Sequence, residues 1–201
     1  MPEIKIIHGD CMEYMATLPD KAFDLAIVDP PYGINIAEWD KNIPSEKNFT
    51  DLFRVSKNQI IWGGNYFNLP HTEGWICWHK TYNYGDGGFK GMSDFELAWT
   101  SFLKKAKYYP YQYIGNCIGG KPNYYFIRIH PTQKPVALYD WILRNYAKPG
   151  QRILDTHLGS GSSAIAAHYF GCDFVGCEID VDYFNAAKER FDRETRQVAM
   201  F

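Results

Sequence analysis

Asp29-Pro30-Pro31-Tyr32 brings a carboxylate, two prolines and an aromatic ring together directly after the apolar run Phe23 to Val28. The prolines hold φ at about −65° and remove two backbone donors, so a carboxylate and carbonyl oxygens are held rigidly beside a ring. Two such acceptors can take both hydrogens of an exocyclic amino group, which moves its nitrogen toward tetrahedral geometry, while Tyr32 stacks on the base. The motif therefore indicates a pocket that activates a nucleobase amino group. A turn without chemistry is the alternative, since Asp and Pro are common in turns.

A second candidate site is the glycine-rich stretch Gly159-Ser160-Gly161-Ser162, which follows the strand-like residues Ile153 to Asp155. Small residues between a strand and a helix let a ligand approach the backbone, and an acid such as Glu178, at the end of the next predicted strand, can accept hydrogen bonds from both hydroxyls of a ribose. Together they predict a nucleoside-containing cofactor, although an ordinary strand-to-helix turn also favours glycine. An NAD-dependent oxidoreductase fits the same pattern, but only 40 residues follow Gly161, too few for a second mononucleotide-binding half unless the fold is permuted.

The elements around these motifs alternate between strands and helices. Short apolar runs predict strands at 4–8, 23–28, 59–62, 74–78, 95–100, 123–129, 152–155 and 173–177, and helical spacing predicts helices at 11–18, 136–146, 162–170 and 181–196. This order indicates an α/β sheet with helices on both faces, whose ligands gather beyond the carboxyl ends of the strands. Both motifs follow such ends, so we expect them to face each other across one cleft.

The composition bounds the class of protein. A chain of 201 residues with 46% hydrophobic and 22% charged residues predicts one folded domain, 1–201, and excludes disordered and fibrous classes. No run reaches the roughly 18 apolar residues of a membrane span, and Met1 to Asp10 lacks the pattern of a signal sequence. We expect a soluble protein of the cytoplasm, either bacterial or that of a phage host. The five cysteines and six histidines lack the spacing of a disulfide framework or a metal site, so we expect neither.

Positive charge and aromatic rings gather in one part of the chain. Residues 97–139 contain no Asp or Glu but six Lys or Arg, which leaves −8 for the rest of a chain whose net charge is −2. Cations can neutralise phosphates while rings stack on exposed bases, so the segment 97–134 is the candidate nucleic-acid contact. A half-buried sheet edge that carries lysines for solubility is the alternative. The candidate phosphate-binding residues are Lys104, Lys105, Lys107, Lys121 and Arg128.

The order of the motifs resembles that of the S-adenosylmethionine-dependent DNA amino methyltransferases, in the beta permutation where the catalytic motif precedes the cofactor motif. The resemblance covers nearly the whole chain and is carried, besides Asp29 to Tyr32, by Gly9-Asp10-Cys11, Trp62 to Tyr66, His130 to Pro135, Asp155 to Ala164 and Gly176 to Asp180. It implies a Rossmann-like methyltransferase fold, which is a mostly parallel seven-stranded sheet with a reversed last strand and helices on both faces.

The resemblance also implies roles for single residues. Asp29, Pro30, Pro31 and Tyr32 would form the catalytic pocket. The glycine loop would cradle the methionine part of the cofactor, Glu178 would hold its ribose, Asp10 and Cys11 would meet its adenine, and Lys134 would lie near its carboxylate. Members commonly have Pro-Phe where this chain has Thr156-His157, so His157 stands where a ring contact is expected. The implied cofactor-binding residues are Asp10, Cys11, Asp29, Lys134, Asp155, His157, Gly159, Ser160, Gly161, Ser162, Glu178 and Ile179.

The activity implied is that of a site-specific enzyme of the restriction–modification type. Asp rather than Ser at position 29 resembles the branch that methylates the N6 amino group of adenine in DNA, and the cytosine-N4 branch is the alternative. A base inside a duplex cannot reach Asp29, so the target must be flipped out. A nucleic-acid-binding module without catalysis is a third reading, which the intact motifs disfavour.

Two further partners are suggested by resemblance. Members of this class often dimerise, so a homodimer is a candidate assembly that the sequence alone does not decide. The last residues, Gln197 to Phe201, resemble the Q-x-x-[LM]-F peptide by which bacterial replication proteins dock onto the sliding clamp. A helix end that folds back on the body is the alternative, because chain termini are often loosely held.

Overall fold

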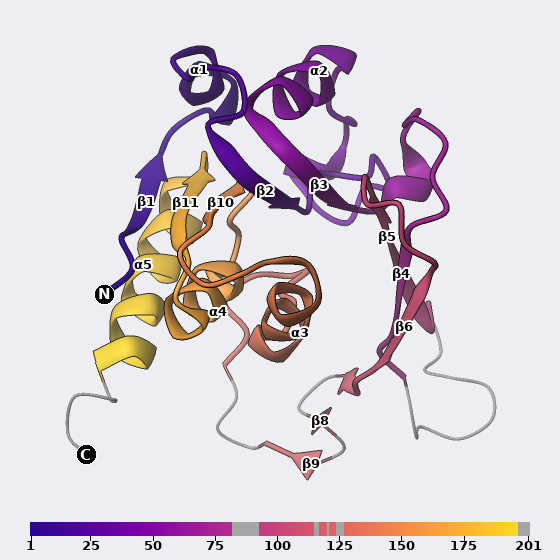
Figure 1. The fold of residues 1–201 in the computed structure, drawn as a ribbon. Coiled ribbons are helices and arrows are strands. Elements are labelled where there is room, and N and C mark those ends of the chain that lie inside the picture. The colour runs from indigo at the N-terminus through magenta and orange to yellow at the C-terminus, as the bar shows by residue number, and fades with distance from the viewer. Residues whose placement is uncertain (82–92, 115–116, 120, 124–126, 197–201) are drawn as a thin grey trace.

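A mixed sheet of eight strands forms the centre of the part of the chain that the computed structural model describes, residues 1–81, 93–114, 117–119, 121–123 and 127–196 (Figure 1). Its strands are β1 (Ile4–His8), β2 (Phe23–Val28), β3 (Ser56–Trp62), β4 (Trp75–His79), β5 (Phe95–Thr100), β6 (Lys107–Pro110), β10 (Arg152–Asp155) and β11 (Asp173–Glu178). Their order across the sheet is β1-β11-β10-β2-β3-β5-β4-β6. A separate small sheet contains β7 (Tyr113–Ile114), β8 (Cys117–Ile118) and β9 (Lys121–Pro122).

The strands of the large sheet run parallel to their neighbours except β5, which is antiparallel to both β3 and β4. Seven strands therefore end at one edge, which we call the carboxyl edge, and β5 begins there. The expected mostly parallel α/β sheet with one reversed strand is confirmed. Two details differ from the expectation. The large sheet has eight strands rather than seven because β6 pairs with β4, and the reversed strand lies inside this sheet because β5 pairs with both β3 and β4.

Helices cover both faces of the sheet. The helices α1 (Cys11–Ala16) and α2 (Glu46–Val55) lie on one face, and α3 (Val136–Tyr146), α4 (Ser162–Phe170) and α5 (Val181–Arg196) lie on the other (Figure 1). The helix α4 begins after Gly161, where a side chain would meet the carbonyl oxygen of Ala187 in α5 at 3.3 Å. Its small residues let α4 pack closely against its neighbours, which fixes the glycine loop against the helical layer.

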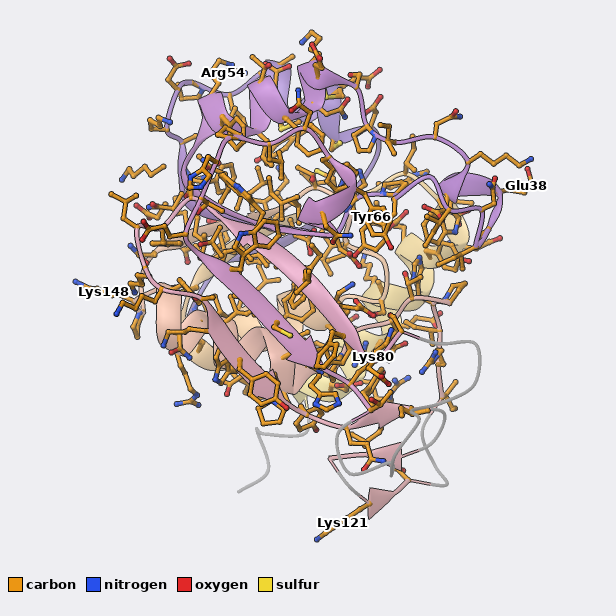
Figure 2. The ribbon with its side chains drawn as sticks, turned by 90° about the vertical axis from the view of Figure 1, so that its right-hand side faces the viewer. Glu38, Arg54, Tyr66, Lys80, Lys121 and Lys148 are labelled. Atoms are coloured by element: carbon orange, nitrogen blue, oxygen red, sulfur yellow. The ribbon has the colours of Figure 1, made fainter. Side chains whose placement is uncertain are left out.

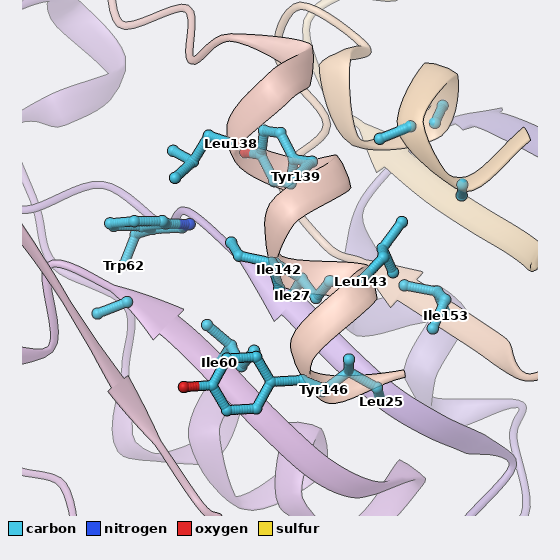
Figure 3. Packing of buried hydrophobic residues seen from close by; sticks show 14 of the residues in the cluster. Leu25, Ile27, Ile60, Trp62, Leu138, Tyr139, Ile142, Leu143, Tyr146 and Ile153 are labelled. Atoms are coloured by element: carbon cyan, nitrogen blue, oxygen red, sulfur yellow. The ribbon is translucent and has the colours of Figure 1, made fainter. Parts of the chain in front are cut away.

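The core explains why the strands read as continuous apolar runs. Leu25 and Ile27 of β2 pack with the face of α3, whereas Ala26 and Val28 belong to the cluster beneath α1 and α2. Both faces of β2 are thus buried, as is usual for parallel strands between helical layers. On the α3 side, Figure 3 shows residues of β2 and β3 facing a row of side chains on the helix: Leu138, Tyr139, Ile142, Leu143 and Tyr146.

Most predicted elements are present, with ends that differ by a few residues. The helix α2 is absent from the sequence-based expectations, although Phe49, Leu52 and Phe53 have helical spacing. The strand expected at 123–129 is wrong in its described part, because Asn123 and residues 127–129 are not in a strand, and residues 124–126 lie outside the described chain. The tail that carries the predicted clamp-binding sequence, 197–201, also lies outside it. In the described residues, no helix is long and apolar enough to cross a bilayer.

Candidate active site

The Asp29 motif lies at the carboxyl edge, where β2 ends. The hydroxyl of Tyr32 donates to Asp29 Oδ1 at 2.5 Å, and the Tyr32 ring stacks on Tyr66 with 5.0 Å between centroids. Burial, reinforced by the charge of Asp29, raises the pKa of Tyr32 well above its usual value, so the hydroxyl remains a donor. A side chain at Gly63 would lie 2.2 Å from the Tyr32 ring, and its φ of +65° also requires glycine. The motif is therefore held against the loop that follows β3.

Four charged groups form a chain from Asp29 into the sheet. Lys134 Nζ lies 2.6 Å from Asp29 Oδ2 and 3.0 Å from Glu96 Oε2, and Lys80 Nζ lies 2.8 Å from Glu96 Oε1. Lys134 is only 4% exposed. Burial alone would raise the pKa of Glu96, but Lys134 and Lys80 outweigh it and lower the pKa to about 2. Burial acts to lower the pKa of Lys134, but the two carboxylates raise it. Carboxylates and ammonium groups therefore alternate along this chain, so the buried Lys134 beside the candidate catalytic acid is paired with acids on two sides.

The glycine loop is organised by two buried acids. Asp155, which ends β10, accepts from the Ser163 hydroxyl at 2.6 Å and from the His157 backbone at 3.0 Å. Burial raises the pKa of Asp155 to about 7 despite these hydrogen bonds. Glu178, which ends β11, accepts from the backbone N–H groups of Gly159 at 2.8 Å and Asp180 at 3.0 Å. The carboxylate of Glu178 thus ties the glycine loop to the end of the neighbouring strand.

Arg190 of α5 supports the same loop from behind. Its buried guanidinium donates to the Ser160 carbonyl at 3.0 Å and to the Ser162 hydroxyl at 2.8 Å. The Ser162 hydroxyl in turn donates to the Lys134 carbonyl at 2.7 Å. The loop is therefore connected both to the last helix and to the segment that carries Lys134.

Two cavities meet between these motifs. The larger, of about 650 Å³, contains Tyr32, Tyr66 and Glu96, and the smaller, of about 210 Å³, contains Gly159 and Glu178. Six residues line both: Asp29, Pro31, Trp39, Thr132, Gln133 and Lys134. The expected cleft between the Asp29 motif and the glycine loop is therefore present, with Asp29 and Lys134 at the junction. An added side chain at Gly9, in the smaller cavity, would enter open space.

The structure brings most of the sequence-predicted site residues to these cavities. Pro30, Pro31 and Tyr32 line the larger one with Asp29. The residues of the cofactor set that line the smaller one are Asp10, Cys11, Asp29, Lys134, His157, Gly159, Ser160, Glu178 and Ile179. Asp155, Gly161 and Ser162 do not line either cavity and instead hold the loop from behind. The described residues contain no group of three His, Cys, Asp or Glu side chains that could hold a metal ion.

The predicted phosphate-binding residues separate into two groups. Arg128 lines the larger cavity, and Lys121 lies on β9 of the small sheet, at the lower end of the molecule in Figure 2. Lys104 and Lys107 lie at the opposite edge of the large sheet, where β6 begins, and donate to the backbone and side-chain oxygens of Asn145 at 3.1 and 2.7 Å. Lys105 lies between them. Lys104 also packs over the Tyr146 ring, so this group caps the end of α3 and is not joined to the cavities.

Several residues of the site are missing from the sequence-based expectations. Trp39 lines both cavities and stacks on His130 at 5.3 Å, and His130 meets the Tyr183 ring at 4.4 Å. Glu96 and Lys80 complete the charge chain. Among these residues, the sequence pattern could have indicated only Glu96. In the strand predicted at 95–100, alternation places its carboxylate on the same face as Ala98, which is buried.

His157 predicts a measurable pH dependence. Burial lowers the pKa of His157 from 6.5 to about 4. As the pH falls, His157 is therefore protonated in the unfolded chain before it is protonated in the folded chain. The stability that neutral His157 contributes is complete above pH 6.5 and is lost as the pH falls toward 4. Because a pKa difference of this size corresponds to about 3 kcal/mol, the free energy of unfolding of His157→Phe should fall less steeply than that of the wild type over this range. Urea denaturation at several pH values measures both slopes. The control is His71→Phe, because His71 is exposed. Parallel slopes for all three proteins would refute the lowered pKa of His157.

The comparisons with known proteins agree with this geometry. A family model described as DNA methylase matches residues 71–189. The type II methyltransferase M.HpaI of Haemophilus parainfluenzae is 26% identical over 94% of this chain and 74% of its own length. The solved M1.HpyAVI–SAM complex is 25% identical, with a TM-score of 0.60 over 93% of this chain and 99% of the other. The PvuII DNA methyltransferase (cytosine-N4-specific) shares the fold at 12% identity, with a TM-score of 0.63 over 98% of this chain and 92% of the other.

The family model spans more than half of the chain, and it includes Lys134, the glycine loop and Glu178. The same residues form the smaller cavity and its junction with Asp29. The chain belongs to the DNA methylase family of N6 and N4 amino methyltransferases.

Proposed function

We propose that this protein transfers the methyl group of S-adenosylmethionine to the N6 amino group of adenine at a specific DNA sequence, after the base has left the duplex. The observation that carries the proposal is the junction of the two cavities at Asp29 and Lys134. Such a junction lets one ligand deliver a group to another across a short shared boundary, which is what transfer between a bound donor and a bound base needs.

The smaller cavity fits a nucleoside that carries an amino-acid tail. Gly9, beside open space, and Gly159, in the loop, let a ligand approach the backbone, and Glu178 stands at a strand end where it can accept from ribose hydroxyls. Asp10 caps α1 through the Met12 N–H at 2.7 Å, next to the buried Cys11, where the adenine would lie. S-adenosylmethionine supplies a methyl group already activated by its sulfonium, so no covalent intermediate with the protein is required.

The larger cavity fits the acceptor base. The Asp29 carboxylate and the Pro30 carbonyl would accept the two hydrogens of the amino group, because the Asp29 oxygens keep lone pairs beyond their bonds to Tyr32 and Lys134 and a carbonyl oxygen has two. Tyr66 already covers one face of the Tyr32 ring, so an entering base would stack on the other face or on the 46% exposed Tyr66. Lys134 would hold the Asp29 carboxylate in place while the amine binds.

DNA would reach the site from the carboxyl edge. Arg128 is exposed in the larger cavity and Lys121 is exposed on β9, so both could contact phosphates while a base enters. The lysines at 104, 105 and 107 remain a prediction of the sequence, because their position at the opposite edge would require the duplex to pass around the molecule. Homodimerisation and clamp binding also remain predictions.

Methylation of cytosine N4 is the second candidate, because the DNA methylase family includes both reactions. Asp at position 29 favours adenine by resemblance alone. Both reactions use the same pair of acceptors on an exocyclic amine, so only the product separates them.

The product identifies the reaction. Unmethylated duplex DNA is incubated with the protein and S-adenosylmethionine that carries a deuterated methyl group, then digested to nucleosides and analysed by mass spectrometry. We expect labelled N6-methyldeoxyadenosine. Labelled N4-methyldeoxycytidine would replace the first candidate by the second, and absence of label from all nucleosides would refute both. Calorimetry with S-adenosylmethionine and with NAD, of which only the first should bind, is the control for the cofactor.

A further inference from the structure

The segment after the catalytic motif is wrapped around one buried carboxylate. Asp40 is 2% exposed, and its oxygens accept four backbone N–H groups: those of Tyr32 at 2.7 Å, Gly33 at 3.1 Å, and Ile34 and Ile36 at 3.2 Å each. Hydrogen bonds to a carboxylate are stronger than neutral ones, so this loop has a defined shape. Because Tyr32 is itself one of the donors, the loop is fixed relative to the catalytic motif.

The same loop is anchored a second time at Trp39. This residue belongs to the short helix η1 (Glu38–Asp40), and its ring stacks on His130. Gly33 has a φ of +73° and Asn35 a φ of +59°, so the backbone turns sharply on either side of Ile34. Glu38 marks this segment where it projects from the body in Figure 2.

The loop presents two apolar side chains to solvent at the mouth of the larger cavity. Ile34 is 45% exposed and Ile36 is 53% exposed, and both line that cavity. Neither side chain is needed to hold the loop, because the bonds to Asp40 come from the backbone. Exposed isoleucines on a rigid loop beside a ligand cavity suggest a surface that is covered when the ligand binds.

When a base flips out of a duplex, it leaves an apolar gap in the base stack. Proteins that unstack DNA insert rigid apolar side chains such as Ile, Leu or Phe between base steps. A loop already fixed by Asp40 and Trp39 loses little conformational freedom when it enters such a gap. We propose that Ile34 and Ile36 form a wedge that enters the duplex beside the flipped base and keeps that base in the larger cavity. This inference rests on the proposed function.

A protein partner or a second copy of the chain fits these observations less well. Either one, seated on Ile34 and Ile36, would cover the entrance of the cavity that they line. The wedge instead uses these side chains while the cavity is being filled.

The test separates opening of the duplex from chemistry. The variant Ile34→Ser/Ile36→Ser is compared with the wild type and with Tyr169→Ser, which changes a 49% exposed aromatic side chain near the end of α4 that lines neither cavity. Methylation rates are measured on a fully paired duplex that carries the mapped target site, and on the same duplex with an abasic position opposite the target base. We expect the double variant to lose about tenfold in rate on the paired duplex and to recover to within about twofold on the abasic duplex, where no pair must be broken. Tyr169→Ser should match the wild type on both.

Other outcomes overturn the wedge in recognisable ways. Equal loss on both duplexes would assign the isoleucines to the base pocket itself. Wild-type rates on both duplexes would show that the isoleucines do not act on DNA, and a simultaneous shift of the double variant to smaller particles in sedimentation would assign them to self-association. A wild-type protein that methylates neither duplex would overturn the proposed function and the wedge with it. Calorimetry with S-adenosylmethionine confirms that each variant is folded.

Discussion

Replacing Asp29 by alanine should abolish methyl transfer while S-adenosylmethionine still binds. The variant removes the carboxylate that accepts from the Tyr32 hydroxyl and from Lys134 and that would accept from the target amine. Loss of one preorganised group that stabilises a transition state typically costs a factor of about 10² to 10³, and Asp29 also positions its two neighbours. We therefore expect the transfer rate to fall by about 10³ or more. Rates are measured with labelled cofactor, and binding by calorimetry.

The matched control is an acid near the start of the strand that Asp29 follows. Asp24 lies at the start of β2, where it pairs with Lys57 at 2.7 Å and accepts from the Arg152 backbone at 2.9 Å. Asp24→Ala should lower stability but leave the transfer rate within about twofold of the wild type, as it lies at the edge away from the cavities. Undiminished transfer by Asp29→Ala would show that the larger cavity is not where the amine reacts.

Replacing Glu178 by alanine should weaken the binding of S-adenosylmethionine and leave the transfer rate at saturating cofactor nearly unchanged. Its carboxylate holds the N–H groups of Gly159 and Asp180 and would accept from the ribose. Hydrogen bonds to a charged group contribute about 1.5–3 kcal/mol each, so the Kd for S-adenosylmethionine should rise about 100-fold. The rate at saturating cofactor should stay within about threefold of the wild type, because Glu178 does not touch the base cavity.

Glu178→Gln tests whether this effect comes from the hydrogen bonds. Glutamine keeps one oxygen that can accept from the Gly159 N–H, but its NH2 group replaces the second oxygen, which accepts from the Asp180 N–H. The Kd of Glu178→Gln for S-adenosylmethionine should therefore lie between those of the wild type and Glu178→Ala. An unchanged Kd in both variants would remove Glu178 from the cofactor site. A lower maximal rate with unchanged Kd would place it in catalysis instead.

The sequence predicts the two motifs well because each stands at the end of a buried strand. Parallel strands end at one edge, so a carboxylate after β2 and a glycine loop after β10 had to lie near each other once the sheet formed. The central helices and strands have strong apolar periodicity, and α5 begins and ends where its spacing predicts. The resemblance to the family assigns roles to the same residues, and the match to the DNA methylase family model supports the predicted class of enzyme.

Other parts depend on contacts between distant residues, which local patterns do not encode. Lys134 is 105 residues from Asp29 in the chain, and its second partner, Glu96, lies on the reversed strand. The place of β5 between β3 and β4 follows from pairing across the sheet, not from its own sequence. The number of lysines in a segment likewise does not show at which edge of the sheet they lie. Lys104 and Lys107 belong to the same basic segment as Arg128, but they lie where β6 begins, whereas Arg128 lines the larger cavity. The role of Asp40 depends on backbone bonds within a loop and leaves no periodic signal.

The proposed methyl transfer requires the donor and the acceptor to meet at Asp29 and Lys134. A crystal structure of the protein with S-adenosylhomocysteine, the product of the cofactor, tests this most directly. We predict its ribose beside Glu178, its adenine beside Asp10, and its sulfur at the junction of the two cavities, facing Asp29. A ligand in the larger cavity, or one whose sulfur points away from Asp29, would contradict this placement of the methyl donor.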